Sequence, residues 1–268
     1  MKTKLTILIA ALGLATATGR AQITINALNS AYTQNFNGLI NVDGDSSTYV
    51  DNSTILGWYV NSEEMDSNSD EYFAEDGSDN NAEVYSFGAD MNTDRALGYV
   101  GSGGNDYFNA SVRLVNNSGS EVDEISLSYV GEQWRSGGDT SDNNNILNFS
   151  YRTFIFGGGS LPASTSLTDW TEVNSLDFSA PQTSIAAGPL DGNLSANQTS
   201  FTNVSITGIS WADGEELWLR WTGDDGAGLD AGLGIDDFSV TAIPEPSSLA
   251  LIGLAGLAAL GILRNRRT

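Results

Sequence analysis

The sequence contains neither histidine nor cysteine in its 268 residues. Without cysteine the chain cannot form disulfides, thiolate metal sites, iron–sulfur clusters or a catalytic thiol. Without histidine it has no imidazole for general acid–base chemistry, for the usual serine triad or for histidine-ligated metals. Any catalysis would therefore depend on carboxylates, hydroxyls, arginine or tyrosine. A domain of this size can build its core without disulfides, so the missing cysteines do not limit the fold.

Basic residues are scarce as well. Between residues 22 and 243 the chain has five arginines, no lysine and 33 acidic residues, a net charge of −28. A surface with this charge repels nucleic acid phosphates and anionic lipids, so we expect no nucleic acid partner. The charge is compatible with divalent cations but does not specify one.

Long apolar runs occur only at the two ends of the chain. At the N-terminus, Lys2 and Lys4 precede a mostly apolar run and then small residues as far as Ala21. This layout predicts a secretory signal peptide over residues 1–21, cleaved after Ala21. The apolar run is too short for a retained membrane helix.

The C-terminal segment, residues 243–268, reads IPEPSSLALIGLAGLAALGILRNRRT. Its 17 residues from Ser247 to Leu263 would make about 25 Å of helix, the short end of what spans a bilayer. We therefore expect a single C-terminal transmembrane helix. The basic tail of Arg264, Arg266 and Arg267 would hold the C-terminus in the cytoplasm and place the rest of the chain outside.

The order of Pro244, Glu245 and Pro246, the apolar span and the arginines closely resembles the PEP-CTERM sorting signal of bacterial surface proteins. The resemblance implies that an exosortase is the processing partner. It also implies a transient stay in the inner membrane of a Gram-negative bacterium, then delivery to the cell surface or extracellular matrix. The alternative is an ordinary C-terminal membrane anchor.

Residues 22–242 read as one domain of short strands separated by Gly, Asn, Asp and Ser. Apolar residues alternate cleanly in Phe108–Val115 and Glu124–Val130, and no helical period lasts beyond two turns. Asn61–Asn81 is acidic and polar and is expected to be a loop. The pattern predicts an all-β fold, a jelly-roll-like two-sheet sandwich. Twelve strands are expected, at Gln22–Asn26, Ala31–Phe36, Gly57–Val60, Glu83–Phe87, Arg95–Val100, Phe108–Val115, Glu124–Val130, Leu147–Phe156, Thr171–Phe178, Ser200–Ile206, Glu216–Trp221 and Leu233–Thr241.

The stretch Glu215–Thr241 resembles the closing hairpin of jelly-roll modules in bacterial extracellular proteins, in the words LWLRW and GLGIDDFSV. In related carbohydrate-binding sandwiches an aspartate of the last strand ligates calcium, and calcium prefers six to eight oxygen ligands. Calcium is therefore a candidate cofactor, although aspartates in this position are also common as solvated turn residues. The candidate ligands are Asp224, Asp225, Asp230, Asp236 and Asp237.

Exposed tryptophans stack on sugar rings, but most of the six tryptophans are expected in the core. Trp134 lies beside turn residues, so we expect it to be partly exposed and to be the candidate ligand-binding residue. No complete carboxylate motif is present, which argues against an enzyme. We therefore expect a non-catalytic module that binds or fills exopolysaccharide. The alternatives are a carboxylate-based glycoside hydrolase or lyase acting on that polysaccharide, and a structural coat protein without a ligand.

Overall fold

The computed structural model describes residues 22–62, 71–101, 107–138, 145–155, 157, 169–224 and 230–244. The predicted signal peptide with Ala21, and the predicted membrane span with its basic tail, lie outside the described residues, as do Glu245 and Pro246. Among the described residues, no helix is long and apolar enough to cross a membrane.

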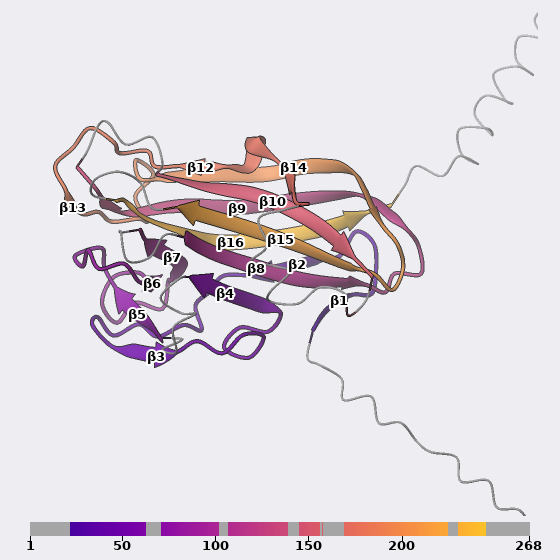
Figure 1. Ribbon diagram of the computed structural model, residues 1–268, viewed down its shortest axis with the longest axis horizontal. Helices are drawn as coiled ribbons and strands as arrows, with labels where there is room; N and C mark the ends of the chain where they lie inside the picture. Colours follow the sequence, from indigo (N-terminus) through magenta and orange to yellow (C-terminus); the bar gives the residue numbers. More distant parts are fainter. Residues whose placement is uncertain are drawn as a thin grey trace, which may run out of the picture.

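Strands from both halves of the chain form two sheets that pack face to face (Figure 1). The fold is therefore an all-β two-sheet sandwich, as the alternation predicts. The first sheet has the order β1-β8-β15-β10-β11, with β4 paired to β8 and β12 paired to β10. Its strands are β1 (Ile23–Ile25), β4 (Trp58–Ser62), β8 (Tyr107–Asn116), β10 (Ile146–Phe154), β11 (Thr171–Glu172), β12 (Phe178–Ser179) and β15 (Glu216–Asp224).

The second sheet has the order β13-β9-β16-β7-β6-β5-β3, with β14 paired to β9 and β2 paired to β16. Its strands are β2 (Ala31–Gln34), β3 (Ser46–Thr48), β5 (Glu71–Glu75), β6 (Val84–Phe87), β7 (Ala96–Val100), β9 (Val122–Ser136), β13 (Gly188–Pro189), β14 (Gln198–Trp211) and β16 (Gly232–Ile243). A one-turn 3-10 helix, η2 (Asn174–Leu176), lies between β11 and β12.

The main core fills the space between the sheets. Trp58 of β4 and Trp221 of β15 stack with their ring centroids 5.9 Å apart, and Phe238 of β16 meets both edge-on from the second sheet. Phe108, Ala110, Val112 and Leu114 are buried on the inner face of β8, as expected. Because inner residues alternate with outer ones along a strand, this core fixes which side chains β8 and β15 direct away from it.

A smaller apolar cluster lies on the opposite side of the second sheet. It consists of Tyr85, Phe87, Ala96, Val100 and Trp134. Both faces of the second sheet are therefore buried over β6, β7 and part of β9.

The expected loop at Asn61–Asn81 is partly wrong. Glu71–Glu75 forms β5, which pairs with β3 and, in parallel, with β6. Tyr72 and Ala74 of this strand are buried. Two apolar side chains at alternate positions are enough to anchor a short strand in an otherwise acidic segment.

Candidate functional site

The outer face of the first sheet, meaning the face turned away from the main core, carries mostly polar side chains. Pairing aligns Asn109 of β8 with Thr222 of β15, and Thr222 with Asn148 of β10. One step along the strands, Arg220 is aligned with both Ser111 and Ser150. The register therefore builds two polar rows across three strands from residues far apart in the sequence.

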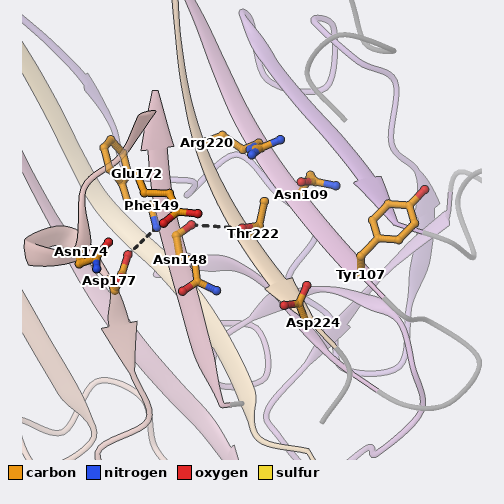
Figure 2. Close-up of a pocket in the computed structure, with 10 residues that line it drawn as sticks. All are labelled: Tyr107, Asn109, Asn148, Phe149, Glu172, Asn174, Asp177, Arg220, Thr222 and Asp224. Atoms are coloured by element: carbon orange, nitrogen blue, oxygen red, sulfur yellow. Dashed lines mark hydrogen bonds between the residues drawn. The ribbon is translucent and has the colours of Figure 1, made fainter. Parts of the chain in front are cut away.

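A cleft of about 370 Å³ lies over these rows (Figure 2). This volume falls within the range of about 300–1,000 Å³ that is typical of small-molecule sites. Figure 2 shows that one side of the cleft comes from β8 and β15 and the other from β10 and the segment around η2. The lining residues are Tyr107, Asn109, Asn148, Phe149, Glu172, Asn174, Asp177, Arg220, Thr222 and Asp224.

Hydrogen bonds hold several of these groups in place. The carboxylate of Asp177 accepts a hydrogen bond from the backbone N–H of Phe149 at 2.8 Å. The hydroxyl of Thr222 donates to the carbonyl oxygen of Asn148 at 3.4 Å. Burial raises the pKa of Asp177, opposed by this backbone hydrogen bond. Hydrogen bonds within the protein therefore fix the positions of Asp177 and Thr222 in the cleft.

Arg220 is the basic residue of the cleft. Its Nε donates to the hydroxyl of Ser150 at 3.2 Å, and its guanidinium carbon lies 3.9 Å from the centroid of the Trp170 ring. Burial lowers the pKa of Arg220 to about 10, while the nearby carboxylate of Glu172 acts in the opposite direction. The side chain stays protonated at neutral pH.

Asn109 is 2% exposed and lines the cleft, yet its Oδ1 has no hydrogen-bond partner among the described residues. The hydroxyl oxygen of Ser111, one step along β8, also lacks a partner in the described part of the chain. A buried polar atom left unpaired costs about 1–3 kcal/mol. Such a cost is characteristic of sites that complete their hydrogen bonds with a ligand or ordered water.

The aspartates predicted as calcium ligands are spread over the sandwich. Asp224 is exposed in the cleft of the first sheet, whereas Asp236 is buried on the outer face of the second sheet. Asp230 is buried between the ends of β15 and β16, Asp237 is exposed, and Asp225 lies outside the described residues. Asp224 and Asp236 belong to different sheets and cannot share one ion, so a calcium site on this hairpin stays a prediction.

A different group of carboxylates does come together. Ligand atoms of Asp43, Glu75 and Asp76 lie within 4.8 Å of one another. Glu75 Oε1 already accepts hydrogen bonds from the backbone N–H groups of residues 76, 78 and 79 and from the Ser78 hydroxyl. These bonds account for the buried carboxylate of Glu75 without an ion.

The expected exposure of Trp134 is wrong. The side chain is 2% exposed and stacks on Phe87 at a centroid distance of 6.2 Å. Its indole N–H donates to Glu132 at 2.9 Å. A Cβ at Gly192 would lie 2.3 Å from the same indole nitrogen, so the segment around Gly192 covers the ring closely. Trp134 therefore belongs to the small cluster of the second sheet, on the opposite side of the molecule from the cleft.

Comparison with known proteins identifies the C-terminal segment. Residues 242–267 match the PEP-CTERM protein-sorting motif. This chain carries that sorting motif. The match covers both prolines and the glutamate of the expected signal and begins one residue before the last strand ends. No curated protein matches the chain.

Several solved structures match this chain at low sequence identity and low TM-score. TmCBM61, solved in complex with beta-1,4-galactotriose, has 9% identity and a TM-score of 0.31, with 69% of this chain and 88% of that chain covered. The CBM22-1 xylan-binding domain of Paenibacillus barcinonensis Xyn10C has 11% identity and a TM-score of 0.30, covering 76% and 98%. The non-crystalline cellulose specific module CBM28 has 10% identity and a TM-score of 0.29, covering 76% and 97%.

Proposed function

We propose that this chain is an exosortase-processed surface protein whose sandwich binds exopolysaccharide in the cleft of the first sheet without cleaving it. The PEP-CTERM motif supports export and surface delivery. The observation that carries the binding proposal is the polar cleft with the unpaired, buried amide oxygen of Asn109. The strand order, with an early and a late strand in each sheet, is the basis for interpreting the sandwich as jelly-roll-like.

The chemistry of the cleft suits sugar hydroxyls. Each hydroxyl both donates and accepts a hydrogen bond, and so does each asparagine side chain, while carboxylates accept and a guanidinium donates. The cleft offers three asparagines, three carboxylates and one arginine. Because they come from β8, β10, β11, β15 and the η2 segment, they can engage several hydroxyls of one chain at once.

The binding proposal can be tested by affinity electrophoresis of the fragment 22–243, which contains every described strand. Gels containing the host exopolysaccharide should retard the fragment and leave the polymer intact. Asn148→Ala should reduce retardation, because it removes an amide from the cleft. The matched control is Asn193→Ala, since Asn193 is exposed outside the cleft, and it should migrate like the wild type.

The two alternatives have distinct outcomes in the same gels. A carboxylate-based glycosidase or lyase has a specific observation in its favour, namely the three carboxylates in one cleft, and it would shorten the polymer. Free migration of the wild-type fragment would instead support a coat protein without a ligand.

The sorting proposal has its own test. In the host, the full chain with Pro244, Glu245 and Pro246 all replaced by alanine should accumulate unprocessed in the inner membrane. The matched control replaces Ser247 and Ser248 with alanine and leaves the motif intact. Normal processing and release of the triple variant would contradict a role for the exosortase.

A further inference from the structure

We infer that the cleft of the first sheet selects a sugar with a free, protonated amine, so that the glycan it binds contains an amino sugar rather than only neutral or uronic acid units. The inference rests on the proposed function, because it names the ligand class for the same cleft. The argument depends on hydrogen-bond capacity and on charge.

The unpaired amide oxygen of Asn109 in the cleft calls for a hydrogen-bond donor. Oδ1 of an asparagine is an acceptor and nothing else, and in Asn109 this atom is buried without a partner among the described residues. A protonated amine offers three N–H donors from one atom, more than a hydroxyl can.

The charge of the cleft points the same way. Glu172 and Asp224 are exposed, Asp177 is half-buried, and all three line the cleft. Arg220 is the one positive side chain in the lining and interacts with the Glu172 carboxylate, so the three carboxylates exceed the positive charge of the lining by two. A uronic acid would add negative charge to this set and a neutral sugar would leave it uncompensated. An ammonium group compensates it, because opposite charges at close range attract and charge-assisted hydrogen bonds are the stronger ones.

A calorimetric titration of the full chain in a non-ionic detergent tests the inference. The three probes are a tetrasaccharide of β-1,4-linked glucosamine, its fully N-acetylated form, and a β-1,4-linked uronic acid tetrasaccharide. We expect the free-amine form to bind at least about tenfold more tightly than the acetylated form, which has lost the charge and two of the donors. The uronic acid form should bind more weakly than either.

Because the whole domain is acidic, any cation could be attracted without a site, and the variants exclude this explanation. Asn109→Ala changes no charge and should weaken binding of the free-amine form about tenfold by removing the buried acceptor. Glu172→Gln and Asp224→Asn should each weaken it about three- to fivefold, as expected for exposed charges. Glu121→Gln removes an exposed charge outside the cleft and should have no effect. Melting temperatures show whether Asn109→Ala still folds; if it does not, the two carboxylate variants decide.

The outcomes separate the inference from the proposed function. Selective binding of the free amine, weakened by the cleft variants but not by Glu121→Gln, supports the inference. Equal binding of the free-amine and acetylated forms overturns the inference and leaves glycan binding in the cleft intact. Equal losses in all charge variants, with none in Asn109→Ala, would indicate charge attraction alone and overturn it as well. No binding of any probe, together with free migration in the exopolysaccharide gels, would overturn both.

Discussion

Replacing Glu216 with glutamine removes the carboxylate that neutralises a buried arginine in the first sheet. Nη2 of Arg113 lies 2.5 Å from Oε1 of Glu216, and their side chains are 5% and 0% exposed. Glu216 also accepts hydrogen bonds from the backbone N–H of Gly157 and the indole N–H of Trp218. Burial acts to lower the pKa of Arg113, but hydrogen bonds to Glu216 and Tyr59 outweigh it and the pKa is raised.

The magnitude follows from what glutamine cannot do. Glutamine keeps the shape of glutamate, but it has one acceptor oxygen in place of two and turns an N–H₂ group toward Arg113 or Trp218. Removing one partner of a buried ion pair costs about 3–5 kcal/mol, because the remaining charge stays in a poorly solvated position. In a domain of this length, 1 kcal/mol lowers the melting temperature by about 2–4 °C. We therefore expect Glu216→Gln to lower it by at least about 6 °C.

Thermal and urea unfolding of the domain 22–243 measure the effect. Glu71→Gln is the matched control, since Glu71 is exposed at the start of β5, and it should change stability by no more than about 0.5 kcal/mol. The double variant Arg113→Met, Glu216→Leu removes both charges and should be more stable than Glu216→Leu alone. If Glu216→Gln lies within about 1 kcal/mol of the wild type, the reasoning from a buried, dependent charge pair is refuted.

Three further predictions concern the second sheet and the calcium hypothesis. Burial raises the pKa of Asp236 to about 9 and that of Glu132 to about 7, so the folded protein holds both protons more tightly than the unfolded chain does. The free energy of unfolding should therefore fall as the pH rises from about 4 toward 9. Asp236→Asn should reduce the difference in this free energy between pH 5 and pH 8, measured by urea unfolding. An unchanged difference in the variant would contradict the raised pKa of Asp236. Trp134→Ala should lower the free energy of unfolding by about 3–5 kcal/mol. Retardation by exopolysaccharide should stay unchanged in gels run below the melting temperature of this variant, because the ring is buried away from the cleft. Loss of retardation in the folded variant would restore Trp134 as a ligand-binding residue. If an aspartate of the last hairpin binds calcium, millimolar calcium should raise the melting temperature above its value in chelator. Asp230→Asn should abolish this difference. Equal melting temperatures of the wild type with calcium and with chelator would exclude the site.

Much of the sandwich could be predicted from alternation, because the inner residues of β8 and β15 repeat with a period of two. The C-terminal end of β9 could not be predicted from this pattern. Its predicted range, Glu124–Val130, stops where Gly131 and Glu132 interrupt the pattern, yet the strand continues to Ser136. There the outer face is covered by residues from distant segments, such as Gly192 over Trp134. A strand buried on both faces no longer alternates between apolar and polar residues, and the same covering made the predicted exposure of Trp134 wrong.

The cleft was partly visible in the sequence and partly hidden. Alternation along β8 directs Asn109 and Ser111 away from the core, which the sequence shows. Their alignment with Thr222 and Arg220 depends on strand pairing across more than 100 residues of chain, and Asn148 is aligned through Thr222 from a third strand. No local pattern contains that register. Polar residues on an outer face also look like solvated ones until the structure shows which of them are buried and unpaired.

The position of the cleft relative to the sorting motif links the two parts of the proposed function. At the cleft end, the carbonyl of Asp224 accepts a hydrogen bond from the Tyr99 hydroxyl, and Tyr99 pairs with Leu233 near the start of β16. The motif follows the opposite end of the same strand, where Ile243 pairs with Glu124. From Leu233 to Ile243 the strand advances by ten residues, which at about 3.3 Å per residue separates these ends by roughly 33 Å. Figure 1 shows β15 and β16 running in opposite directions along the long axis. The C-terminal segment therefore begins at the end of β16 that lies away from the Asp224 end of the cleft.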